Sequence, residues 1–80
     1  MPYYFFLWDE KNIRHVAEHG VTTEEFEEVV QAPQGVEASR SSGLPVAFGY
    51  TADGRFLACV YEKLDDDTIY PVTAYEPDED

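Results

Sequence analysis

Two histidines, His15 and His19, are the residues of this sequence best suited to acid–base chemistry. They stand four positions apart, and in a helix this spacing places their Cβ atoms about 5–6 Å from each other. Such a pair could exchange protons with the 2′-hydroxyl and the leaving oxygen of an RNA phosphodiester. It could also bind a metal ion if a third ligand such as Glu18 completed the site.

A structural role is the simpler interpretation of the same pair. One histidine would pack at a helix C-terminus, where the helix dipole favours a cation, and the other would face solvent. The sequence contains no phosphate-binding glycine loop, CxxC pair or nucleophile elbow. We therefore predict neither a cofactor nor a bound metal.

Cations that could hold a phosphate are scarce, and catalysis of phosphoryl transfer needs two or more of them together. Arg55 and Lys63 lie at the two ends of one predicted strand, roughly 26 Å apart at 3.3 Å per residue, so they cannot share a small site. Arg40 is the more plausible partner for either one. Singly, each of these residues is an ordinary surface charge.

The charge balance is strongly acidic, with 17 Asp and Glu against 5 Lys and Arg and a formal net charge of −12. This charge repels nucleic-acid phosphates and attracts a basic partner. It also serves to keep a small domain in solution. Four glutamates between residues 24 and 28 exclude a DNA-recognition helix there, because they would face the phosphates with like charge.

Residues 8–30 are predicted to form two short helices that are interrupted at Gly20. Asp9 suits the first N-cap, since its carboxylate can accept from free backbone amides. Ile13, Val16 and Ala17 then recur with the spacing of one buried stripe. Gly20 is expected to end this helix in a left-handed conformation, which glycine adopts without strain.

The second helix has its own start signals. Thr22 and Glu25 form the pattern of a capping box, in which each side chain satisfies the backbone amide of the other. Val21 and Phe26 flank this cap in the positions of a hydrophobic staple. The helix is expected to end before Pro33, because the residue that precedes a proline avoids helical angles.

The N-terminal residues 1–8 are almost entirely aromatic and apolar. As a strand, residues 3–8 would present apolar side chains on both faces, which is typical of a strand that is covered on both sides. We favour a position inside the sheet for it. A second chain could supply one of the covers, so this strand is also a candidate surface for homodimerisation or for binding a partner protein.

The predicted fold class is α+β: an antiparallel meander sheet of four to five strands with two short N-terminal helices packed on one face. Hairpin turns are predicted at Asp53-Gly54 and at residues 65–67. Pro71 cannot donate to a ladder, so its strand should lie at an edge or contain a bulge. Residues 1–76 would form one domain and 77–80 a frayed acidic tail. The later strands are predicted over residues 36–40, 46–51, 56–64 and 68–76.

The single cysteine, Cys59, lies in an apolar run and is expected to be a buried core residue of a protein in a reducing compartment. No signal peptide and no apolar run of about 20 residues is evident. The expected location is therefore the cytoplasm.

Several features together form a recognisable pattern: Trp8-Asp9, the turn His19-Gly20-Val21, the Glu-rich helix after it, Gly54-Arg55 and the closing strand 69–75. The chain resembles the BrnT-like toxins, compact relatives of the RelE-type ribonucleases of type II toxin–antitoxin systems. This resemblance implies helices packed on a sheet, metal-independent RNA cleavage, and neutralisation by an antitoxin of ribbon-helix-helix type.

The chain departs from this family pattern at several positions. His15 stands where the family commonly has Asn, Glu18 where it has a basic residue, and Tyr75 where it has Arg. The basic C-terminal helix is replaced by the acidic residues 77–80. The catalytic residues that the resemblance still implies are His15, His19, Arg40 and Arg55.

Two functions remain as hypotheses from the sequence. The first is a small endoribonuclease toxin that would use a histidine as acid or base and arginines at the phosphate. The second is a non-catalytic protein-interaction module of the same fold, acidic and a candidate homodimer. The composition favours the second hypothesis, and the family resemblance favours the first.

Overall fold

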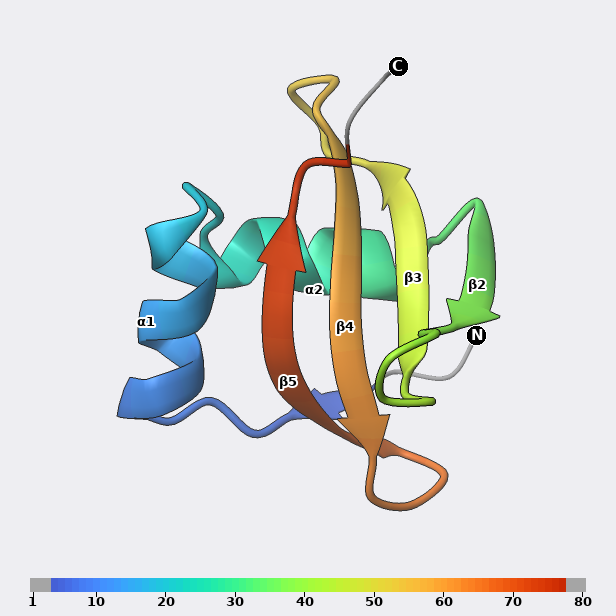
Figure 1. Cartoon of the computed structure of the whole chain (residues 1–80). Coiled ribbons are helices and arrows are strands. Elements are labelled where there is room, and N and C mark those ends of the chain that lie inside the picture. Colours follow the sequence, from blue (N-terminus) through green and yellow to red (C-terminus); the bar gives the residue numbers. More distant parts are fainter. Residues whose placement is uncertain (1–3, 78–80) are drawn as a thin grey trace.

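The computed structural model describes residues 4–77, which form two helices and a five-stranded sheet (Figure 1). The predicted α+β fold class is confirmed. The tail residues 78–80 and the first residue of the predicted N-terminal strand, Tyr3, lie outside the described residues. The elements are β1 (Phe5–Phe6), α1 (Glu10–Glu18), α2 (Thr23–Gln31), β2 (Gly35–Ala38), β3 (Pro45–Tyr50), β4 (Phe56–Lys63) and β5 (Thr68–Tyr75).

The sheet has the strand order β1-β5-β4-β3-β2, so that β2 to β5 form the predicted antiparallel meander. The sheet as a whole is mixed, because β1 pairs with β5 in parallel, Phe5 opposite Thr68. Between β4 and β5 the register shifts: Val60 pairs with Thr73 and Tyr61 with Pro71. Val72 is therefore an extra residue on β5, and the predicted bulge beside Pro71 is confirmed.

The position of β1 corrects one prediction. We expected the N-terminal strand inside the sheet, but β1 is an edge strand. Within the described chain it pairs only with β5. Its alternation agrees with the sequence: Tyr4, Phe6 and Trp8 pack against the core, whereas Phe5 is 64% exposed. One apolar face of this segment therefore meets solvent.

The local signals at the helix ends are confirmed. Asp9 caps α1 and Thr22 caps α2, where Thr22 and Glu25 form a capping box with bonds of 3.0 Å in both directions. Gly20 has φ = 74°, the left-handed conformation that ends α1. Val21 and Phe26, the predicted staple, are both buried in the main core.

The buried stripe of α1 differs from the prediction. Val16 is buried, but Ile13 and Ala17 are exposed, and Asn12 is buried in their place. Figure 1 shows the reason: α1 stands beside the margin of β5, whereas α2 lies behind β3 and β4. A helix at a margin buries a narrow stripe, and the neighbouring backbone of β5 selects a polar residue within it.

The main core lies between α2 and the sheet. It contains Phe26, Val29 and Val30 from α2, against Leu57 and Cys59 of β4. The rings of Trp8 and Phe6 meet Phe26 edge-on, with centroids 5.3 and 6.4 Å away. Such edge-to-face pairs add a modest stabilisation to the burial itself. No helix formed by residues 4–77 is long and apolar enough to cross a membrane.

Candidate functional site

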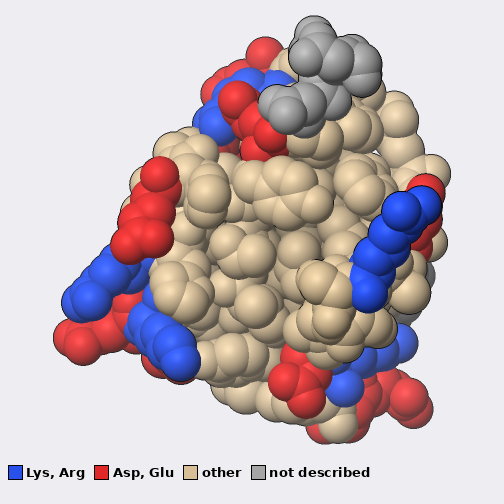
Figure 2. Space-filling model, in the orientation of Figure 1, with Lys and Arg blue, Asp and Glu red and all other residues tan. Residues whose placement is uncertain are grey.

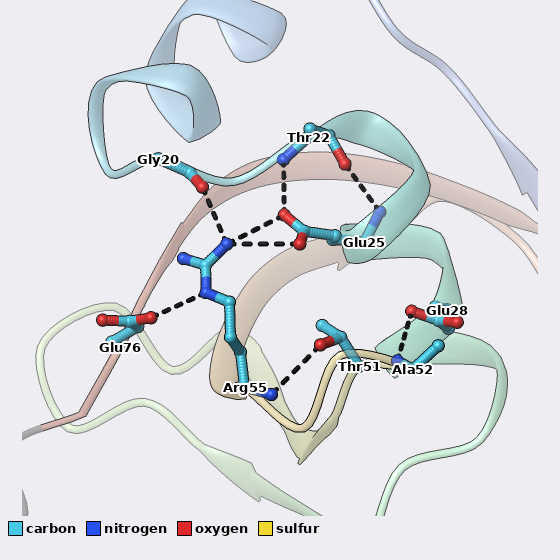
Figure 3. Close-up of polar contacts among 8 residues, drawn as sticks. All are labelled: Gly20, Thr22, Glu25, Glu28, Thr51, Ala52, Arg55 and Glu76. Carbon is cyan, nitrogen blue, oxygen red and sulfur yellow. Dashed lines mark hydrogen bonds and ion pairs between the residues drawn. The ribbon is translucent and has the colours of Figure 1, made fainter.

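Arg55 is the most highly connected polar residue of the candidate set (Figure 3). It lies between the β3–β4 turn and the start of β4. Its Nε donates to Glu76 at 2.8 Å, and its Nη1 donates to both carboxylate oxygens of Glu25 at 3.1 and 3.2 Å. Nη1 also donates to the carbonyl of Gly20 at 3.0 Å. The guanidinium thus joins the β4 start to the turn between the helices and to the end of β5.

Local structure holds both partners of this contact in place. The capping box at Thr22 fixes the Glu25 carboxylate, and the Thr51 hydroxyl accepts a hydrogen bond from the Arg55 amide at 3.2 Å. The turn is tied to α2 by the Ala52 amide, which donates to Glu28 at 3.1 Å. The hydrogen bond to Glu76, assisted by the charge of Glu25, raises the pKa of Arg55. Two carboxylates already neutralise the charge that an RNA phosphate would need.

His19 lies next to this contact in the chain. It is the exposed C-cap residue of α1, and its backbone amide donates to the carbonyl of Val16 at 3.1 Å. Because Arg55 reaches the carbonyl of the following residue, Gly20, the fold brings this histidine and arginine to the same corner. These are two of the four residues that the sequence nominated.

Arg40 lies elsewhere. It follows β2 in the loop that leads to β3, whereas Arg55 follows the other end of β3. A six-residue strand separates the two loops by about 20 Å at 3.3 Å per residue. Arg40 instead borders a shallow groove of about 360 Å³, lined by Glu37, Ala38, Ser39, Ser41, Val46, Phe48 and Tyr75.

His15 has a third location, at the margin of β5. Its Nδ1 lies 3.3 Å from the carbonyl oxygen of Val72, the bulged residue. Beside it, Asn12 Nδ2 donates to the carbonyls of Leu7 at 2.9 Å and Pro71 at 3.0 Å. Helix α1 therefore satisfies backbone groups along a strand edge that would otherwise be open.

Asn12 was missed by the sequence analysis. Its side-chain Oδ1 accepts a hydrogen bond from the Asp9 backbone amide, and its backbone amide donates to the Asp9 carboxylate, both at 2.8 Å. This is a capping box with Asn in the position usually held by Glu or Gln, and the spacing Asp-x-x-Asn was the available signal. Tyr70 donates to the same carboxylate at 2.8 Å. The pKa of Asp9 is lowered, chiefly by the Asn12 amide and then by Tyr70.

The side of the sheet away from α2 carries a second apolar cluster. Val46, Ala58 and Val60 form its buried centre, and Leu44, Phe48 and Val72 pack around them. The Phe48 and Phe56 rings are stacked with centroids 6.2 Å apart. Tyr50 and Tyr75 extend this surface, with exposed fractions of 54% and 39%. We call these residues together the open face.

No helix of the described chain lies over the open face, which Figure 2 shows from the front. Its middle is uncharged, and both positive and negative side chains appear at its margin. The sequence contained a signal for it that we did not use. In both β3 and β4 the apolar residues occupy both alternating faces, whereas α2 covers only one.

The opposite side of the molecule is acidic. A groove of about 610 Å³ follows α2 and is lined by Thr22, Glu24, Glu25, Glu27, Glu28, Gln31 and Asp53. Within residues 4–77 no three His, Cys, Asp or Glu side chains are grouped closely enough to hold a metal ion. Cys59 lies in the main core, and burial raises the pKa of its thiol to about 12. This thiol is therefore not a nucleophile at neutral pH.

Comparison of the chain with protein-family models, curated proteins and solved structures finds no match.

Proposed function

We propose that this chain is a non-catalytic protein-interaction domain that binds through its open face. The observation that carries the proposal is the uncharged side of the sheet that no described helix covers, with the exposed rings of Tyr50 and Tyr75 around its apolar centre. Surface of this kind, with exposed aromatic rings and no charge at its middle, is typical of binding sites in soluble proteins.

The sequence of the central strands supports the same proposal. In β4 the residues Phe56, Ala58 and Val60 face one way, and Leu57 and Cys59 face α2. A sheet with one solvated face normally alternates apolar and polar residues, whereas a sheet that is covered twice reads as a continuous apolar run. Strand β4 has the second pattern, but among residues 4–77 a helix covers only one of its two faces.

The composition of the open face also agrees with a binding surface. Its centre is apolar, and towards the flanks polar atoms appear at Glu37 of β2 and at Tyr70 and Thr73 of β5. An apolar centre within a polar rim is the usual anatomy of a specific protein interface.

The test of the non-catalytic part is an RNA cleavage assay with purified protein at low salt and without added metal. We expect a labelled single-stranded RNA to remain intact over a time in which a small amount of a known ribonuclease degrades it. Cleavage that co-purifies with the wild type and is lost in Arg55→Ala would overturn the proposal.

A second candidate function is the endoribonuclease toxin that the family resemblance implies, with a ribbon-helix-helix antitoxin as partner. It is favoured by one observation, the approach of Arg55 to the turn that follows His19. RNA would have to displace Glu25 and Glu76 from the guanidinium before Arg55 could hold a phosphate.

This second candidate makes a distinct prediction. Glu76→Gln should raise RNA cleavage, because it removes one of the carboxylates that compete for Arg55, and His19→Ala should abolish it. Lys63→Ala, which removes a cation at the far end of β4, is the matched control and should leave cleavage unchanged. Growth arrest on expression should follow the same order. Equal, background activity in all variants would dismiss the nuclease.

A further inference from the structure

We infer that the occupant of the open face is a second copy of this chain, in a symmetric face-to-face dimer. The inference rests on the proposed function and names the partner of the same surface. In a two-fold dimer the same patch serves both partners, so the patch must be complementary to itself. Charge, rim composition and size each bear on this requirement.

The distribution of charge is the first argument. The four glutamates of α2 have no cation on their own helix, and they line the groove on the far side of the sheet from the open face. Two chains that each carry a charge of −12 repel one another at long range. A contact through the two open faces keeps the α2 helices on the outside of the dimer, at the greatest separation from each other.

The rim of the open face is the second argument. A rim of one sign would repel its own copy, but here side chains of both signs lie along it. Glu37 and Arg40 line one groove beside β2, and Glu76 forms an ion pair with Arg55 where β5 ends. Figure 2 shows both signs around the uncharged centre. Such a mixed rim can meet its own copy without net repulsion.

The size of the face sets the expected affinity. The eight residues of β4 span about 26 Å, and four strands at about 4.8 Å cover about 19 Å, hence a footprint of about 500 Å². Two such footprints bury about 1,000 Å², which is the lower end for a specific interface. We therefore expect a reversible dimer with a dissociation constant in the micromolar range rather than an obligate one.

A basic protein partner is the competing occupant, and the charge distribution argues against it on this face. Long-range attraction would lead such a partner to the acidic side along α2, where Glu24, Glu27 and Glu28 lie in a groove and have no ion pair within the described residues. The open face offers it an apolar surface with a balanced rim, which gives no advantage to a partner of opposite charge.

The experiment is sedimentation equilibrium of the full chain from about 1 µM to about 1 mM, the range in which a micromolar dimer dissociates. We expect the mass to rise from 9.1 kDa towards twice that value. Tyr75→Glu places a carboxylate on each half of the dimer contact and should weaken association at least tenfold, because like charges that face each other are costly. Tyr50→Glu, on the same face, provides a second variant.

The matched control is Val36→Glu. Val36 is about as exposed as the tyrosines, but it pairs with Ala47, which belongs to the core on the α2 side, so its side chain lies off the open face. This variant adds the same charge and should dimerise like the wild type. Circular dichroism of all variants distinguishes lost association from lost folding.

Salt provides an independent test. Because the two chains have the same net charge, raising the salt concentration from about 20 mM to about 200 mM should strengthen the dimer through screening. A wild type that is monomeric at about 1 mM, or a Val36→Glu variant that is weakened as much as Tyr75→Glu, would overturn the inference. Neither result bears on the RNA assay, so the dimer can fail while the non-catalytic function stands.

Discussion

The two faces of this sheet are built from alternate residues of the same strands, yet they differ in what lies over them. Leu57 and Cys59 of β4 meet α2, with Phe26 at the centre of that contact. Phe56, Ala58 and Val60 of the same strand belong to the open face. The comparison teaches that apolar character alone does not tell which face of a strand is core, because both faces here have it. The difference is produced by α2, the one helix within residues 4–77 that lies across the sheet.

The difference in cover between the two faces is tested most directly by replacing one phenylalanine on each side. Phe26 is fully buried beneath the sheet, and Phe48 is partly exposed on the open face. We expect Phe26→Ala to cost about 3–5 kcal/mol of the free energy of unfolding, since it removes a ring and leaves a cavity. Phe48→Ala should cost about 1 kcal/mol, because part of its surface is already in water. Urea denaturation at low protein concentration measures both. Equal losses would mean that the two faces are equally covered.

A smaller loss of stability is expected at the margin of β5. There the Asn12 side chain donates hydrogen bonds to the backbone carbonyls of Leu7 and Pro71. Asn12→Ala leaves these carbonyls without their donor in a buried position, and we expect a loss of about 2–3 kcal/mol. The neighbouring change Ile13→Ala is the control; it removes a side chain that is 42% exposed and should cost less than about 1 kcal/mol. If Ile13→Ala lowered the stability more than Asn12→Ala, the buried stripe predicted from the sequence would be correct and the role of Asn12 would be refuted.

The smallest expected effect is the pH dependence of the stability that Asp9 contributes. Asp9 joins α1 to Tyr70 of β5, and its pKa lies below the ordinary value of an aspartate because the Asn12 amide and then the Tyr70 hydroxyl stabilise the carboxylate. A lowered pKa in the folded state contributes stability above the unfolded value of about 4, and this contribution is lost as the pH falls through the folded value.

Asp9→Asn keeps a neutral cap but removes this titration. The stability advantage of the wild type over the variant should therefore be complete at pH 6 and shrink as the pH falls below about 4. Thermal unfolding across this range measures it, and Asp53→Asn in the exposed β3–β4 turn is the control. An advantage that does not change with pH would contradict a titrating contact at Asp9.

The helix boundaries could be predicted because their signals are local. Asp9, Thr22, Glu25 and Gly20 act on backbone groups within one turn of themselves, and the structure confirms each of them. The meander and the bulge beside Pro71 were predictable for a similar reason, since a proline restricts its own ladder position. The buried stripe of α1 was not predictable from periodicity, because the neighbour that Asn12 satisfies lies 59 residues away.

The candidate site was predictable only as a set of residue types. The histidines and arginines could be identified as candidate catalytic residues from the sequence. Which of them lie close together in space depends on which strand ends lie near which turns. The fold brings Arg55 to the turn after His19, places His15 at the margin of β5, and leaves Arg40 at the other end of β3. The contacts of Arg55 with Glu25 and Glu76 span 30 and 21 residues, so no local pattern indicated them. The nuclease assignment therefore stays a prediction.

The sequence by itself determined the local elements of this protein: two capped helices, a glycine break, an antiparallel meander and a chain with far more acid than base. The tertiary structure was needed to show that α2 covers one face of the sheet, that α1 lies along the margin of β5, and that no helix of residues 4–77 covers the opposite face. The physical reason is range. Caps, turns and alternation depend on groups a few residues apart, whereas cover, burial and charge pairing depend on segments that meet only after the chain has folded.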